Sequence, residues 1–175
     1  MESDKLNKNC KEITIPVVVF LQCIKIKDNI WIDQKWQAVG VVPSKKELEE
    51  THQPILVSNI NDEPIYQYND FILKLVNDEL DSYYQNIRSN NASVFIICRY
   101  DDNQNPVPFL ITLSYDEAAI YMETDEIIYT VAIDIQIYQI LERFVLENYT
   151  PEKRKKRKLV KGTAGNHYKQ ASEYI

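Results

Sequence analysis

Residues 13–26 constrain the fold of this 175-residue chain more than any other segment. Apolar side chains alternate between the two faces of an extended chain there, with Val17, Val19, Leu21 and Cys23 on one face and Val18, Phe20 and Ile24 on the other. A strand that is apolar on both faces is covered on both sides. The run 13–21 is interrupted by Thr14 and Pro16 and is shorter than the roughly 20 residues that cross a bilayer. The segment therefore predicts a buried strand of a water-soluble fold.

Turn-forming residues divide the following sequence into further strands. Asp28 and Asn29 mark a turn after the first strand, and residues 31–42 resume the strand pattern, so the two segments predict a long hairpin. Four more apolar stretches follow at 66–76, 82–88, 93–100 and 107–113, separated by short clusters rich in Asn, Asp, Ser and Pro. Adjacent strands joined by short loops predict an antiparallel meander.

Two of these stretches show the period of two that a half-buried sheet requires. The first carries Phe71, Leu73 and Leu75 on one face, and the last carries Phe109, Ile111 and Leu113 on one face. Six strands therefore precede the first helix in this interpretation.

Helices are expected only in the last part of the folded region. Ser114 and Glu117 have the spacing of a capping box, in which each side chain satisfies an amide of the first turn of a helix over 115–122. Asp134 can cap a second, longer helix that runs to about residue 149 and ends before Pro151. The predicted fold class is α+β, with a mostly antiparallel sheet of about six strands followed by two helices packed on it.

Charge separates the body of the chain from its end. From Lys153 onward the chain has eight Lys or Arg residues and one acid, which gives +7. The other 152 residues carry 12 basic and 25 acidic groups, which gives −13. We expect a polar lead-in at 1–12, a single α+β domain at 13–150, and a disordered basic tail at 151–175. The consecutive basic residues of the tail are Lys153, Arg154, Lys155, Lys156, Arg157 and Lys158.

Several site classes lack the residues that they need. Cys10, Cys23 and Cys98 are odd in number and widely spaced, which fits neither a disulfide framework nor a zinc knuckle. The two histidines, His52 and His167, have no cysteine cluster beside them in the sequence. Three glycines cannot build a phosphate-binding loop of either common spacing. We therefore expect no metal, no cofactor and no catalytic residue, and turn formation and capping explain most of the paired acids.

The start of the chain is polar with both charge signs, and it shows neither the apolar stretch nor the cleavage site of a secretory signal. The expected location is the cytoplasm.

Exposed aromatic residues on a sheet can bind a protein partner, although sheet packing alone would also place them there. The partner-binding candidates are Trp31, Trp36, Tyr83, Tyr84, Tyr115 and Asp116. The basic tail could contact an acidic partner or the phosphates of a nucleic acid. The acidic body repels nucleic acid, and the tail lacks aromatic residues between its basic ones, so nucleic-acid binding is the weaker alternative.

Five sequence blocks resemble, in order, a bacterial family known as domain of unknown function 3305. They are IPVVVFLQ at 15–22, W-x4-W-x2-VGVVP at 31–43, YYQNIRSNNASVFIICR at 83–99, PFLITLSYDEA at 108–118 and FVLENYTPEKRKKRK at 144–158. Genes of that family often lie beside those for molybdenum-dependent formate dehydrogenase.

The resemblance implies a non-enzymatic accessory or binding protein whose partner is a formate dehydrogenase subunit. It carries over no catalytic residue. A small enzyme with an unrecognised carboxylate site is the second hypothesis, and nucleic-acid binding through the basic tail is the third. The sequence leaves the oligomeric state open.

Overall fold

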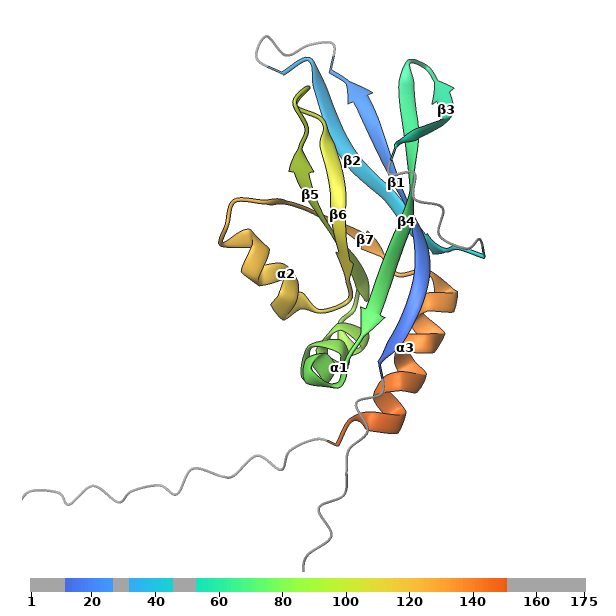
Figure 1. Cartoon of the computed structure of the whole chain (residues 1–175), viewed down its shortest axis with the longest axis vertical. Helices are drawn as coiled ribbons and strands as arrows, with labels where there is room; N and C mark the ends of the chain where they lie inside the picture. The colour runs from blue at the N-terminus through green and yellow to red at the C-terminus, as the bar shows by residue number, and fades with distance from the viewer. Residues whose placement is uncertain (1–11, 27–31, 46–52, 151–175) are drawn as a thin grey trace, which may run out of the picture.

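The computed structural model describes residues 12–26, 32–45 and 53–150. Strands and helices within these ranges follow one another as β1 (Ile13–Lys25), β2 (Gln34–Pro43), β3 (Ile55–Ile60), β4 (Glu63–Leu75), the 3-10 turn η1 (Asn77–Glu79), α1 (Leu80–Arg88), β5 (Ser93–Tyr100), β6 (Pro106–Thr112), α2 (Tyr115–Met122), β7 (Ile127–Ala132) and α3 (Ile135–Asn148). Figure 1 shows that the strands form two sheets, with helices gathered toward one end.

The larger sheet has the order β2-β1-β4-β3, and every neighbouring pair in it is antiparallel. The predicted hairpin of the first two strands is confirmed, since Val19 of β1 lies opposite Val41 of β2. On its other side Val19 lies opposite Tyr68 of β4. The face of β1 that carries Val19 and Leu21 is fully buried, whereas Phe20 on the other face is half-buried.

The smaller sheet has the order β6-β5-β7 and is also antiparallel. Its central strand, β5, is buried on both faces. Val94, Ile96 and Cys98 of β5 enter the main core, whereas Phe95 and Ile97 pack against Ala118 of α2 in a second, smaller cluster. This double coverage explains why β5 is apolar at consecutive positions rather than alternate ones.

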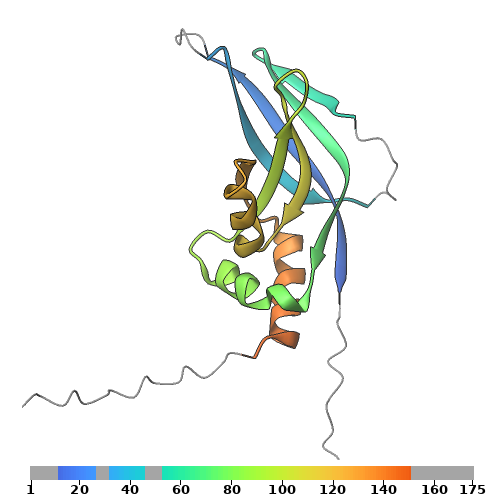
Figure 2. The same cartoon turned by 60° about the vertical axis from the view of Figure 1, so that its left-hand side comes forward.

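The main core fills the space between the two sheets. β2 lies beside β7 and β4 lies beside β6, so the sheets approach each other along two seams where none of the described strands pair across. α1 and α3 pack against each other at one end of the sheets (Figure 2). α3 contributes Ile137, Leu141, Phe144 and Val145 to this core.

The prediction of an antiparallel α+β fold is confirmed, but the prediction of a single sheet of about six strands followed by two helices is wrong. The described residues form sheets of four and three strands, with three α-helices. β4 and β5 do not pair, because the chain between them forms a helix and β5 starts a separate sheet with β6 and β7.

The main cause of this error is the segment 82–88, which was predicted as a strand and belongs to α1. Leu80, Tyr83, Tyr84 and Ile87 recur at spacings of three and four residues and pack on the main core. This is the spacing of one helix face. β3 and β7 were not predicted at all.

Phe109 shows a smaller difference between the predicted and the observed face of a strand. Ile111 and Leu113 enter the main core as their period of two predicts, but Phe109 packs in the second cluster with Phe95 and Ile97. The ladder between β5 and β6 shifts register between Ile97 and Cys98, whose partners are Leu110 and Pro108, so Phe109 is the extra residue of a bulge. A bulge reverses the face on which the following alternation falls.

Both predicted helices are present. α2 spans Tyr115–Met122, as the sequence indicated, and α3 begins after Asp134, whose side chain accepts a hydrogen bond from the N–H of Gln136. All of the predicted lead-in at 1–12 except Glu12, and the whole predicted basic tail at 151–175, lie outside the described residues, so the domain boundaries stay predictions. Within the part of the chain that the structure describes, no helix is long and apolar enough to cross a membrane.

Candidate binding pocket between α1 and α2

A buried asparagine fixes α1 against the smaller sheet. Asn86 donates from Nδ2 to the carbonyl oxygens of Ser93 and Leu113, each at 2.8 Å, and its Oδ1 accepts from the N–H of Ser93 at 2.9 Å. Asn86 thus joins the last turn of α1 to the first residue of β5 and to the residue after β6. Because Asn86 is only 8% exposed, these bonds replace the hydrogen bonds that its amide would otherwise make with water.

The start of α2 is tied to α1 by side chains of both helices. Ser114 is fully buried, and its Oγ accepts from the N–H of Glu117 at 3.0 Å and donates to Oε2 of Glu79 at 2.5 Å. The N–H of Asp116 donates to Oγ of Ser82 on α1 at 3.2 Å. These bonds hold the first turn of α2 beside the first turns of α1.

Glu117 does not complete the predicted capping box. The N–H of Ser114, which Glu117 would bond in that motif, donates instead to Oγ1 of Thr112 at 3.0 Å. The carboxylate that accepts the hydrogen bond of the Ser114 hydroxyl belongs to Glu79, which is distant in the sequence. The carboxylate of Glu117 is thus left out of the cap.

A pocket of about 390 Å³ lies between α1, the start of β5 and the N-terminus of α2. It is lined by Asp81, Ser82, Gln85, Asn86, Ser89, Asn91, Ser93, Phe95, Tyr115 and Asp116. We call it the α1–α2 pocket. Two of the sequence-predicted contact residues, Tyr115 and Asp116, therefore lie together on its rim.

Tyr115 offers the pocket an accessible aromatic ring. It is 55% exposed, and its ring meets that of Phe95 edge to face, with centroids 6.0 Å apart. Phe95 thus supports the Tyr115 ring by an edge-to-face contact, while more than half of the residue stays exposed to solvent. Asp81 and Asp116 are exposed carboxylates on the α1 and α2 sides of the same pocket.

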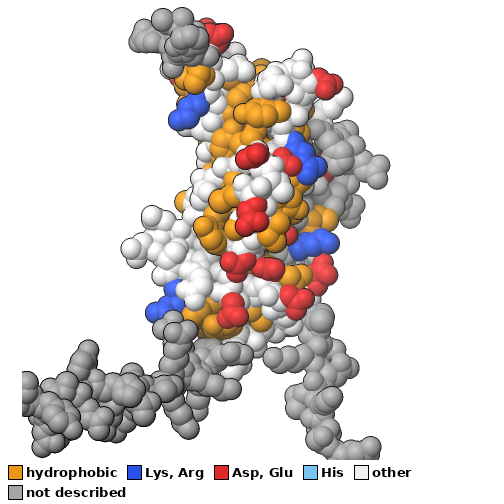
Figure 3. Space-filling model, turned by 90° about the vertical axis from the view of Figure 1, so that its left-hand side faces the viewer, with side chains coloured by type: hydrophobic (Ala, Val, Ile, Leu, Met, Phe, Trp, Pro, Cys, Tyr) orange, Lys and Arg blue, Asp and Glu red, His pale blue; other side chains and the backbone are white. Residues whose placement is uncertain are grey.

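The part of the fold around this pocket is strongly acidic. Residues 77–134 contain eleven Asp or Glu residues but only two basic ones, Arg88 and Arg99. Arg99 pairs with Glu126 at 2.8 Å, and Arg88 donates to the hydroxyl of Tyr84 at 2.9 Å. Figure 3 shows acidic side chains distributed among apolar ones on the α2 side of the molecule. Such a surface attracts positively charged groups.

Burial in the core alters the pKa values of five tyrosine and cysteine side chains. Burial raises the pKa of Tyr68, Tyr83, Tyr129 and Cys98 to about 12 in each case, and burial also raises the pKa of Cys23. These five shifts have desolvation as their largest cause, which is the effect of packing a neutral side chain in the interior. Among residues 12–26, 32–45 and 53–150, no group of three or more His, Cys, Asp or Glu side chains could hold a metal ion.

The other aromatic candidates lie elsewhere in the fold. Trp36 is half-buried on β2 and packs on Tyr66, with ring centroids 5.6 Å apart. Tyr83 is 1% exposed, so its ring is a packing element and not a contact surface. Tyr84 stacks on Tyr149, with ring centroids 4.4 Å apart. Trp31 and the basic run at 153–158 lie outside the described residues.

Sequence reasoning missed the wall of the pocket that α1 provides. Asp81, Ser82, Gln85 and Asn86 line it, but they fell in or beside a segment predicted as a strand. The recurrence of Leu80, Tyr83, Tyr84 and Ile87 at helical spacing was the signal that could have identified α1. With α1 recognised, Asp81 and Gln85 would have been polar helix positions open to solvent.

Over residues 16–158 the chain matches the family described as Protein of unknown function (DUF3305). This span runs from the fourth residue of β1 to beyond the end of α3, and it includes all the residues that line the α1–α2 pocket. No curated protein and no solved structure matches the chain.

Proposed function

Since the chain belongs to the family Protein of unknown function (DUF3305), we propose that it is a non-enzymatic accessory protein that binds a subunit of a formate dehydrogenase-type redox enzyme. The resemblance described above implies the identity of the partner, because genes of the family often lie beside those for that enzyme. The α1–α2 pocket is the proposed contact site on this protein.

The observation that carries the binding role is the position of Tyr115 and Asp116 on one rim. An exposed tyrosine whose ring already contacts a second aromatic ring is a typical anchor at protein interfaces, since it buries a large area and loses little conformational freedom. Asp116 lies directly beside it, and Asp81 lies across the pocket. A contact surface needs this combination of an aromatic anchor and charged groups at the rim.

The acidity of the pocket specifies the chemistry of the bound segment. Asp81 and Asp116 favour a Lys or Arg side chain, which would gain charge-assisted hydrogen bonds from the carboxylates. The exposed Tyr115 ring could in addition receive a cation at about 6 Å or less from its centroid. We therefore propose that a basic segment of the redox-enzyme subunit enters the pocket.

The test titrates the full-length protein against each purified subunit of molybdenum-dependent formate dehydrogenase by calorimetry. One subunit should bind, and Tyr115→Ala should weaken that binding by about tenfold or more. The double variant Asp81→Asn/Asp116→Asn should weaken it to a similar degree, about tenfold. Affinity purification from the native host should recover the same subunit.

Matched controls separate the pocket from general surface effects. Tyr100 is exposed at the far end of β5, and Asp102 and Asp125 are exposed acids that do not line the pocket. Tyr100→Ala and Asp102→Asn/Asp125→Asn should bind like the wild-type protein. If no subunit binds, the proposed partner is wrong; if a subunit binds and all variants bind equally, the partner stands and the pocket is not the contact site.

A further inference from the structure

β4 has an uncovered edge over its second half. β3 pairs with β4 from Ile60 opposite Glu63 to Ile55 opposite Gln67, and this ladder ends there. β1 covers the other side of β4 as far as Leu75. Among the described residues, no strand pairs with residues 69–75 of β4 on the side that faces away from β1.

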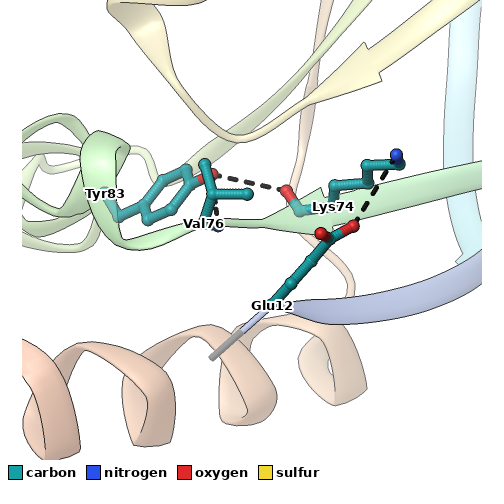
Figure 4. A network of polar contacts seen from close by, with 4 residues as sticks. All are labelled: Glu12, Lys74, Val76 and Tyr83. Atoms are coloured by element: carbon teal, nitrogen blue, oxygen red, sulfur yellow. Dashed lines mark hydrogen bonds and ion pairs between the residues drawn. The ribbon is translucent and has the colours of Figure 1, made fainter. Parts of the chain in front are cut away.

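The last backbone groups of this edge are satisfied by a side chain. The hydroxyl of Tyr83 donates to the carbonyl of Lys74 at 3.3 Å and accepts from the N–H of Val76 at 3.4 Å. Figure 4 shows Tyr83 reaching these groups while the Lys74 side chain pairs with Glu12. The carbonyl of Lys74 therefore points away from β1.

The same geometry applies two residues earlier, at Ile72. Backbone groups of alternate residues on a strand point to the same side, so the N–H and carbonyl of Ile72 also face away from β1. The residue opposite Ile72 is Pro16, which has no N–H, and its carbonyl accepts from the N–H of Ser44 on the far side. Ile72 thus directs one donor and one acceptor toward the open edge.

A groove of about 440 Å³ lies along this edge. It is lined by residues 68–72 of β4 and 107–111 of β6, and we call it the β4–β6 groove. β6 carries Pro106 and Pro108, which lack N–H groups and make a strand edge a poor template for pairing. The β4 wall is therefore the one that can bond an added strand.

Asp70, which lines the same groove, carries an unsatisfied acceptor. It lies at a bulge where Asn69 and Asp70 oppose the single residue Val18, and its φ of 69° is left-handed. Its Oδ2 is buried and has no hydrogen-bond partner in the part of the chain that the structure describes. A buried carboxylate oxygen without a partner is costly, so a cationic donor beside the Asp70 carboxyl group would be favourable.

We propose that the β4–β6 groove binds a short extended segment of a partner protein that carries a Lys or Arg side chain. The segment adds to the edge of β4 by hydrogen bonds to the backbone of Ile72, and its cation bonds to Asp70. Strand addition of this kind takes its affinity from the main chain and its specificity from side-chain pockets. The groove is separate from the α1–α2 pocket, and none of its lining residues is shared with it.

The test uses a blocked heptapeptide of alternating Val and Thr with a central Lys, added to the full-length protein and followed by nuclear magnetic resonance. Amide shifts should move at residues 69–74, with a dissociation constant of about 1 mM or tighter. A peptide with a central Glu, and a Lys peptide methylated on alternate amide nitrogens, should each bind about tenfold more weakly.

Two variants test the two kinds of contact. Asp70→Asn should weaken the Lys peptide by about fivefold or more and leave a central-Thr peptide unaffected, because only the cation contact changes. The matched control is Asp125→Asn, since Asp125 also has a left-handed φ and does not line the groove. Ile72→Pro removes the N–H that faces the groove but none that faces β1, and it should weaken both peptides.

Several results would overturn the proposal. The first two are no binding of the Lys peptide at about 1 mM and amide shifts that map to the α1–α2 pocket. The third is binding of the Lys peptide by Asp70→Asn as tightly as by the wild-type protein. The fourth is amide shifts in the groove that depend on protein concentration alone, which would identify a second copy of the chain as the occupant. A thermal midpoint for each variant shows that it is folded. Tyr115→Ala should bind the peptide normally, so failure here is distinguishable from failure of the proposed function.

Discussion

The hydroxyl of Ser114, at the N-terminus of α2, donates a hydrogen bond of 2.5 Å to the carboxylate of Glu79 at the start of α1. The two residues are 35 positions apart in the sequence, so this bond joins helices that follow different strands of the fold. The same Ser114 oxygen accepts the N–H of Glu117. One buried hydroxyl therefore both caps α2 and sets its position against α1, which is the geometry that forms the α1–α2 pocket.

Ser114→Ala should lower the free energy of unfolding by about 1 to 2 kcal/mol, because it removes a helix cap and leaves Glu79 without its partner. Urea denaturation measures the change. Asp116→Ala and Glu117→Ala should each cost less, since the hydrogen bonds at the start of α2 do not use their carboxylates. A loss at Glu117→Ala as large as that at Ser114→Ala would indicate that the full capping box forms in solution.

Asn86→Ala should be more damaging than Ser114→Ala. It removes three hydrogen bonds and leaves the carbonyls of Ser93 and Leu113 without this donor, so we expect a loss of about 2 to 4 kcal/mol. The matched control is Asn90→Ala, because Asn90 is exposed just after α1 and should change stability by less than about 0.5 kcal/mol. Equal effects of the two substitutions would contradict the bridging role of Asn86.

Most strands of this fold could be predicted from the sequence, because their apolar residues stand at alternate positions or in a consecutive run. β1, β2, β4, β5 and β6 all gave that pattern, and the antiparallel pairing followed from the short turns between neighbours. The division into two sheets was not predictable, because it depends on α1. Tyr83, Tyr84 and Ile87 favour strands by propensity, and a helix of nine residues repeats its period too few times to outweigh that preference.

The candidate site was predictable only in part, for the same reason. The spacing of Ser114 and Glu117 located the start of α2, and with it the exposed pair Tyr115 and Asp116. The facing wall from α1 could not be anticipated once that segment was assigned to a strand. The partner of Ser114, Glu79, depends on tertiary packing and leaves no local sequence signal.

Stability should fall at alkaline pH. The pKa of Cys98 rises from its ordinary 9.0 to about 12, and that of Tyr68, Tyr83 and Tyr129 rises from 10.0 to about 12. The folded protein holds these protons more tightly than the unfolded chain, so their contribution is complete below about pH 9 and is lost as the pH rises toward 12. The free energy of unfolding, measured at several pH values in this window, should decline steadily.

The variant Tyr129→Phe checks this account, because it removes one of the titrating groups and no hydroxyl hydrogen bond is found for Tyr129 among the described contacts. Its decline between about pH 10 and pH 12 should be shallower than that of the wild-type protein. A free energy of unfolding that stays constant to pH 12 would mean that these side chains are not buried in solution.

Removal of the residues after Glu152 should leave the thermal midpoint nearly unchanged. The described core ends before that point, and Tyr149, which stacks on Tyr84, is retained. A second truncation, after Asn148, should lower the midpoint measurably because it removes Tyr149 and this stacking contact. A large loss of stability for the first truncation would show that the basic segment contributes to the fold.

The same truncation after Glu152 separates the two kinds of partner that a basic tail could have. If the six basic residues at 153–158 bind about six phosphates of DNA, the logarithm of the binding constant should fall with the logarithm of salt concentration with a slope near −5. We expect instead weak DNA binding by the intact chain, because its body carries −13 and repels the phosphates. Binding to one formate dehydrogenase subunit should persist after truncation, since the α1–α2 pocket lies wholly before residue 150. Tight DNA binding with the steep salt dependence, lost on truncation, would favour the nucleic-acid alternative over the accessory role.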